Sequence, residues 1–118
     1  MDFTLTDDQR AFQDMARGFA QEHLAPHAAE WDETGHFPVD KLREAAKLGF
    51  AGLYCGEEFG GTGLTRLDAA ILFEELSAAC PSTAAYISIH NMVAWMIDSF
   101  GNAEQKQRWL PAMFAMDI

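Results

Sequence analysis

The sequence predicts an all-α domain of about five helices arranged around a central fourth helix. Two observations predict this class. Apolar residues recur at the 3.6-residue spacing of helices in several segments, and no segment alternates with period 2 for long enough to form a strand. With 118 residues, of which 49% are hydrophobic, the chain can bury one core without disulfides or a structural metal. We therefore treat residues 1–118 as one domain.

The first helix is expected to begin after Thr6, which forms a capping-box pattern with Gln9. Pro26 is expected to end or kink this helix. The segment between Pro26 and Pro38 contains Trp31, Gly35 and Phe37 and is interpreted as a connection that lays its aromatic side chains on the core. The apolar stripe of the first helix consists of Phe12, Met15, Ala16, Phe19, Ala20, His23 and Leu24.

The second and third helices are separated by a glycine-rich loop. Pro38 suits the first turn of the second helix, because its missing N–H needs no partner there, and Gly49 is a plausible stop. Residues 50–64 hold five glycines and are expected to be loop. The third helix is expected from Leu67 until Pro81 closes it. The buried face of the second helix is expected to comprise Leu42, Ala45, Ala46 and Leu48.

The fourth helix is the most apolar. It is expected to start from a cap at Ser82 or Thr83 and to end at Phe100. Because its other side is scarcely more polar than its main stripe, we expect it to be buried in the middle of the domain. The main stripe consists of Ala85, Ser88, Ile89, Met92, Val93, Met96, Ile97 and Phe100.

A short fifth helix completes the predicted fold. Asn102 and Gln105 form its cap, and it is expected over residues 104–110, before Pro111. The short connections favour antiparallel packing of neighbouring helices. The last six residues, 113–118, are mostly apolar and carry no stop signal, so we expect that the chain is a piece of a longer protein.

The composition excludes several classes of function. Eight basic and 18 acidic residues give a net charge of −10, which argues against nucleic acid as a partner. Cys55 and Cys80 are 25 positions apart and form no pattern typical of zinc or disulfides, so a reduced compartment is expected. No signal or transit peptide and no membrane-spanning stretch is recognisable. A cytoplasmic location is expected if the source is bacterial, and the family resemblance described below implies the mitochondrial matrix if it is eukaryotic.

Two motifs resemble binding sites without meeting their requirements. His23 and His27 have helical metal-ligand spacing, but Pro26 lies between them and the HExxH pattern is absent. We interpret them as a pair at a helix end and not as a metal site. The glycines of residues 56–63 suggest a phosphate cradle, but the segment lacks the Gly-Lys-Ser/Thr ending and carries two carboxylates. We interpret it as a structural loop that needs positive φ angles.

Four polar residues interrupt the apolar fourth helix: Ser88, His90, Asn91 and Asp98. The first interpretation is that each, being buried, satisfies the hydrogen bonds of a neighbour. The second is that small side chains at Ala85 and Ser88 leave room for a ligand. The residues alone favour the first interpretation, and they supply no nucleophile, acid–base pair or reactive thiol.

Several segments, in this order, resemble the N-terminal helical domain of the acyl-CoA dehydrogenases. They are residues 3–9 (FTLTDDQ), 48–53 (LGFAGL), 57–64 (EEFGGTGL) and 100–106 (FGNAEQK). Four more are similar to the members that oxidise isobutyryl-CoA: residues 30–32 (EWD), 37–40 (FPVD), 82–92 (STAAYISIHNM) and 94–102 (AWMIDSFGN). The resemblance extends from residue 3 to residue 111.

The resemblance implies part of a flavoenzyme that oxidises a short branched acyl-CoA between its α and β carbons. In this family a glutamate removes the α proton, FAD accepts the β hydride, and electron-transferring flavoprotein reoxidises the flavin. The family also forms homo-tetramers. The resemblance further implies that the fourth helix forms part of the acyl-pocket wall, through Ala85, Ser88, Ile89 and Met92. It thereby favours the ligand interpretation of this helix over the structural one.

The chain also departs from the family pattern. Cys55, Gly56 and Phe59 replace residues that are frequent in the family, and the Thr-Glu-x-x-x-Gly-Ser-Asp motif of the flavin-binding β domain is absent, as is the C-terminal helical domain. No residue can be assigned as the catalytic base, so we expect the chain alone to be inactive and to bind no FAD stably. Two alternatives stay open: a non-enzymatic helical interaction or oligomerisation domain, and an unrelated helical ligand-binding bundle.

Overall fold

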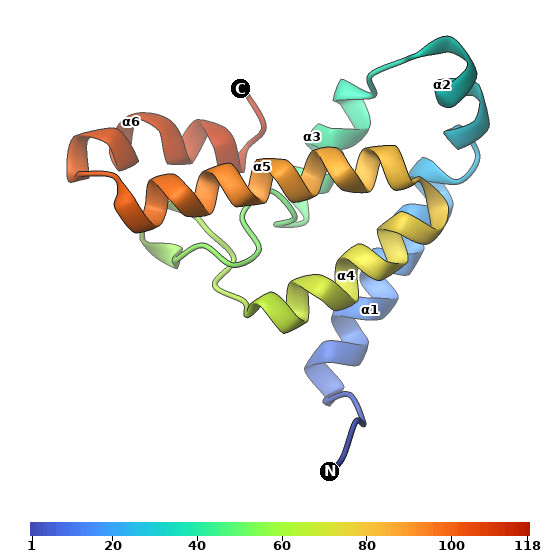
Figure 1. The fold of residues 1–118 in the computed structure, drawn as a ribbon, viewed down its shortest axis with the longest axis horizontal. Helices are drawn as coiled ribbons and strands as arrows, with labels where there is room; N and C mark the ends of the chain where they lie inside the picture. Colours follow the sequence, from blue (N-terminus) through green and yellow to red (C-terminus); the bar gives the residue numbers. More distant parts are fainter.

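The computed structural model describes all 118 residues and confirms the all-α class (Figure 1). Six α-helices are present, one more than predicted, together with a π-helical turn, Ala20–Leu24, and a 3₁₀ turn, Glu57–Phe59. The α-helices are α1 (Asp7–Phe19), α2 (Ala28–Thr34), α3 (Val39–Lys47), α4 (Arg66–Ala79), α5 (Pro81–Phe100) and α6 (Ala103–Phe114).

Helix α1 begins as predicted. The hydroxyl of Thr6 accepts from the backbone N–H of Gln9 at 3.1 Å, and the Gln9 side chain accepts from the N–H of Thr6 at 3.0 Å. The helix then widens into the π-helical turn, which ends at Leu24, before Pro26. The prediction that Pro26 terminates the helix is therefore confirmed, because proline cannot donate to the next helical hydrogen bond.

The segment between Pro26 and Pro38 is a helix and not only a connection. Helix α2 ends at Gly35, whose φ of 69° gives the left-handed cap that glycine adopts easily. At seven residues it is too short to be stable alone. It is held by Trp31, which packs against the core as predicted and stacks on His27 with ring centroids 5.2 Å apart. The same prediction is wrong for Phe37, which is 52% exposed and packs on the ring of Tyr86 instead of on the core.

Pro81 closes α4 as predicted, but it also starts the next helix, and Pro111 does not stop α6 as predicted. Pro81 is the first residue of α5, so this helix starts before the predicted cap at Ser82 or Thr83. Proline suits this position because the first N–H groups of a helix have no intrahelical partner. Pro111 lies inside α6, which continues to Phe114. The lost N–H removes one hydrogen bond, and the backbone bond from Ala115 to Pro111 closes the following turn.

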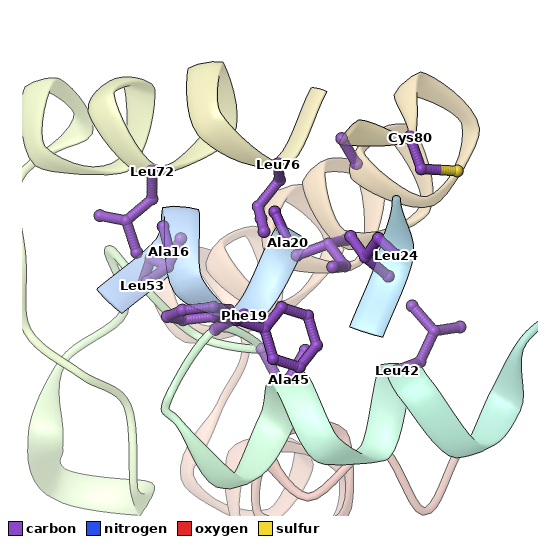
Figure 2. Close-up of a cluster of buried hydrophobic side chains, with 14 of the residues drawn as sticks. Ala16, Phe19, Ala20, Leu24, Leu42, Ala45, Leu53, Leu72, Leu76 and Cys80 are labelled. Atoms are coloured by element: carbon purple, nitrogen blue, oxygen red, sulfur yellow. The ribbon is translucent and has the colours of Figure 1, made fainter. Parts of the chain in front are cut away.

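The core lies where α1 and α4 pack side by side and α5 crosses α4 (Figure 1). Sixteen buried residues form its main cluster, including Ala16, Leu24, Leu72 and Leu76, which face one another between α1 and α4 (Figure 2). Loop residue Leu53 closes the cluster from the side of the glycine-rich loop. None of the helices is both long and apolar enough to cross a membrane.

The prediction that the fourth helix, α5, is buried in the middle of the domain is wrong in this chain. Only one side of α5 is buried, and most of the predicted apolar stripe lies on the exposed side. The molecule measures 43 × 41 × 19 Å, and a helix with its side chains is about 10 Å wide. Its thickness therefore accommodates two layers, which leaves no third layer to cover α5.

Candidate functional site

The predicted wall residues of α5 lie together on its exposed side. Ala85, Ser88, Ile89 and Met92 have the spacing i, i+3, i+4, i+7, which places them on one face of a helix. The side chains are accessible, with Ile89 56% and Met92 47% exposed. The expectation that Ser88 is buried is therefore wrong.

The exposed apolar surface continues along α5 to its end. Val93, Met96 and Phe100 are also exposed, Phe100 by 77%. We call Ala85, Ser88, Ile89, Met92, Val93, Met96 and Phe100 the outward face of α5. This face carries no titratable side chain, so it has no acid, base or charge with which to react.

Two hollows border the outward face. One, of about 510 Å³, lies between α5 and α6 and is lined mainly by Val93, Met96, Phe100 and Trp109. The other, of about 260 Å³, lies where α4 meets the start of α5, and Ala85 and Ser88 are on its edge. The end of the outward face that carries the small side chains of Ala85 and Ser88 is thus the end with open space beside α4.

Asn91 lies on the opposite, buried side of α5 and is 0% exposed. Its side-chain NH₂ donates to the carbonyls of Phe50 at 2.7 Å and Ile87 at 2.8 Å. Its side-chain oxygen accepts from the N–H of Leu53 at 2.6 Å. The structural interpretation is therefore confirmed for Asn91, whose amide ties α5 to the start of the glycine-rich loop.

His90 and Asp98 are also used to bind backbone groups. Nε2 of half-buried His90 lies 2.6 Å from the carbonyl oxygen of Met113, to which it donates in the tautomer that carries this proton. Oδ2 of Asp98 accepts from the N–H of Gly56 at 3.0 Å. These side chains fasten α6 and the glycine-rich loop to α5, as the structural interpretation predicts.

The glycine-rich loop uses its own donors. The N–H of Gly61 donates to Gly56 at 3.1 Å and that of Gly63 donates to Cys55 at 2.9 Å. Gly60 and Gly63 have φ angles of 106° and 72°, in the region that favours glycine. The loop is therefore structural, as predicted, since these N–H groups are not free to bind a phosphate.

The histidines and cysteines do not form a reactive group. His23 lies 3.2 Å from Nζ of Lys41, whereas His27 stacks on Trp31, so the two rings face different neighbours. Both cysteines are free and buried. Burial, reinforced by the negative charge of Asp98, raises the pKa of Cys55 to about 11, which keeps its thiol protonated and unreactive at neutral pH.

One contact beside this site, a cation–π contact of Arg66, was not predicted from the sequence. The guanidinium of Arg66 lies over two rings, 4.4 Å from the centroid of Trp95 and 5.1 Å from that of Tyr54. This contact joins the start of α4 to the glycine-rich loop and to α5. The three residues are separated in the sequence, and no spacing signal connects them.

The family model described as "Acyl-CoA dehydrogenase, N-terminal domain" matches residues 6–117. The chain belongs to this family. Its six helices, with α5 exposing one apolar face, are therefore those of an acyl-CoA dehydrogenase N-terminal domain.

Individual relatives agree with this membership. The chain is 50% identical over 113 residues to mitochondrial isobutyryl-CoA dehydrogenase of Bos taurus, and 52% identical over 113 residues to that of Dictyostelium discoideum. Each match covers 96% of this chain and 27% of the relative. Butyryl-CoA dehydrogenase of Megasphaera elsdenii superposes with a TM-score of 0.87 at 32% identity, over 98% of this chain and 31% of that one.

The chain therefore spans about a quarter of the length of these curated acyl-CoA dehydrogenases. Two of its surfaces do not fit the diphosphate of a flavin. The N–H groups of Gly56, Gly60, Gly61 and Gly63 already donate to groups of the protein. The outward face of α5 offers apolar atoms and the Ser88 hydroxyl but no charged partner for a diphosphate.

Proposed function

We propose that residues 1–118 are the N-terminal helical domain of an FAD-dependent acyl-CoA dehydrogenase that oxidises a short branched acyl-CoA such as isobutyryl-CoA. In that enzyme the outward face of α5 contributes Ala85, Ser88, Ile89 and Met92 to the wall of the acyl pocket. The observation that carries the proposal is the exposure of this apolar face in the 118-residue chain.

The shape of the face suits a short acyl group. Ala85 and Ser88 are small, whereas Ile89 and Met92 are bulky and follow within one to two turns. Each buried methylene of a ligand contributes about 0.8 kcal/mol. A ligand gains this free energy in the space beside Ala85 and Ser88, but Ile89 and Met92 limit the length of that space. The face therefore favours a branched acyl chain of few carbons over a long one.

The chemistry of the face suits binding and orientation. The titratable residues of α5 are Tyr86, His90 and Asp98. The side chains of His90 and Asp98 are turned toward backbone partners, and the Tyr86 ring packs edge-on against Phe37. The residues of this domain therefore hold the acyl chain and exclude water. Bound FAD supplies the hydride acceptor, and both FAD and the base belong to parts of the enzyme outside these residues. The proposed partners of the whole enzyme are the acyl-CoA, electron-transferring flavoprotein, and further copies of the enzyme in a tetramer.

A first test asks what the 118-residue chain does alone. The purified chain is expected to be colourless, without the visible absorption of a bound flavin, and to reduce no dye with isobutyryl-CoA. Stoichiometric flavin with acyl-CoA-dependent dye reduction contradicts the assignment of FAD and base to other domains. Coding DNA that runs in frame past Ile118 into a flavin-domain motif supports the proposal directly.

A second test addresses the wall. In the longer enzyme that carries this domain, Ser88→Phe is expected to lower kcat/KM for isobutyryl-CoA by at least about tenfold, because a ring fills the space beside Ala85. Ser99→Phe is the matched control, since Ser99 is exposed on the same helix about 16 Å farther along. Equal kinetics of the two variants, with thermal midpoints also equal, refutes the assignment.

The same exposed face supports one alternative function, a non-enzymatic interaction or oligomerisation domain. Contiguous exposed apolar surface commonly drives association. Light scattering distinguishes this alternative, because it requires a defined oligomer of the 118-residue chain that dissociates when Met96 is changed to Lys. A monodisperse monomer that binds no apolar dye disfavours it.

A further inference from the structure

Asn91 has a position on α5 that links the core to the outward face. It lies three residues after Ser88 and one before Met92, about 60° and about 100° around the helix from them. Its amide makes three hydrogen bonds of 2.6 to 2.8 Å, two of them to the glycine-rich loop. Because both amide N–H groups and the oxygen are used, the side chain has one favourable orientation.

The loop that Asn91 holds is itself fixed. Phe50 and Leu53, the two partners, are 0% and 1% exposed. The loop closes on itself through bonds from Thr62 to Gly52 at 2.8 Å and from Leu64 to Leu53 at 2.7 Å. Asn91 therefore attaches α5 to a point that cannot follow the helix if the helix turns.

Asn91 is the one fully buried residue of α5 that ties the helix to the loop through its side chain. His90 and Asp98 also bind backbone groups of α6 and of the loop, but both side chains are only half-buried. The residues buried with Asn91 are Thr83, Ala84, Ile87 and Ala94, of which only Ile87 is large. Small side chains make a smooth surface that allows a helix to turn with little loss of packing. A turn of about 10° moves an atom about 6 Å from the helix axis by about 1 Å, which is enough to misplace a substrate-contacting group.

We propose that Asn91 is a positioning residue of the candidate pocket wall: its buried amide, acting with the half-buried side chains of His90 and Asp98, fixes the rotation of α5 and thereby the direction of the Ser88 and Met92 side chains. The structural part of this proposal stands on the hydrogen bonds of Asn91. Its consequence for substrate binding rests on the proposed function.

The structural part is tested in the 118-residue chain by methyl NMR. A lanthanide tag is attached to Asp14→Cys on α1, where the position is exposed and the native thiols of Cys55 and Cys80 are buried. The pseudocontact shifts of the methionine methyls are then compared. Met92 and Met96 report the outward face of α5.

In Asn91→Leu, the pseudocontact shifts of Met92 and Met96 are expected to change while that of Met116, in the main core cluster, stays the same. Ile87→Ala is the matched control, because it removes apolar contacts from the same buried side and leaves the three hydrogen bonds intact. It is expected to lower the thermal midpoint without changing the shift pattern. If Asn91→Leu does not fold, Asn91→Asp retains the acceptor for Leu53 and provides the same comparison.

Unchanged Met92 and Met96 shifts in the folded Asn91 variant overturn the positioning role, as does an equal change in Ile87→Ala. In the longer enzyme, the Asn91 variant is expected to raise KM for isobutyryl-CoA at least threefold more than it lowers kcat. If the pseudocontact shifts of Met92 and Met96 change but KM and kcat for isobutyryl-CoA do not, the wall assignment in the proposed function is refuted. The positioning of α5 by Asn91 then still stands. The two failures are thus distinguishable.

Discussion

Replacing glycine by alanine is predicted to change stability in opposite directions at two positions, Gly61 in the glycine-rich loop and Gly18 in α1. A Cβ added at Gly61 would lie 2.6 Å from the carbonyl oxygen of Cys55 and closer still to that of Gly56. Both are backbone atoms, which cannot move aside as a flexible side chain does. Gly18, inside α1, has nothing within 4 Å of the same added atom, so Gly18→Ala meets no obstacle.

The magnitudes follow from these two environments. Forcing a methyl group into packed atoms costs about 1 to 3 kcal/mol, and weakening the Gly61 to Gly56 hydrogen bond costs about 1 kcal/mol more. We therefore expect Gly61→Ala to lower the free energy of unfolding by about 3 kcal/mol. Gly18→Ala is expected to raise it by up to about 1 kcal/mol, because alanine is the better helix former.

Thermal unfolding followed by circular dichroism measures both effects. For a domain of 118 residues, 1 kcal/mol corresponds to about 4 °C in the midpoint. Gly61→Ala should therefore melt about 12 °C below the unsubstituted chain, and Gly18→Ala up to about 4 °C above it. A midpoint of Gly61→Ala within 2 °C of the unsubstituted chain, taken as about the precision of the measurement, refutes the view that this glycine is required by backbone packing.

Two further predictions concern ionisable groups. The hydrogen bond and charge of Arg17, 2.8 Å away, hold the pKa of Glu75 below its usual value, so its stabilising effect is present above the unfolded pKa and is lost as pH falls through the lowered value. The stability difference between the unsubstituted chain and Glu75→Gln, measured by urea titration at low salt, should therefore shrink on acidification, and a constant difference argues against it. The raised pKa of Cys55, about 11, predicts that the native chain reacts with a thiol reagent at pH 8 far more slowly than the unfolded chain; equal rates contradict the burial of this thiol.

The sequence predicted most helix positions because their signals are local. The Thr6 capping box and the Asn102 cap with Gln105 are formed as expected, since a cap needs only residues three apart. Helix α2 was missed because seven residues between two prolines carry too little periodicity to be recognised. Its stability comes from the packing of Trp31 on the core, which is a tertiary contact.

The prolines show a second limit of local signals. A proline both ends one helix and suits the first turn of the next. Pro81 therefore closes α4 and starts α5 within two residues, which a pattern on either side alone does not reveal. Pro111 is tolerated inside α6 because contacts of α6 with α5, among them His90 with Met113, hold the helix on both sides of the missing donor.

The two sides of α5 could not be told apart by hydropathy, because both are rich in apolar residues. The structure assigns them by hydrogen bonds: the buried side carries Asn91, and half-buried Asp98 binds the loop, while Ile89, Met92 and Met96 face outward. Burying an amide is favourable only when all its hydrogen bonds are made, and here they are. The exposed parts of Ile89, Met92 and Met96, by contrast, do not stabilise the folded 118-residue chain. A helix with this distribution buries its remaining apolar surface only when something covers the outward face, and in the proposed function a short acyl chain and the domains around it do so.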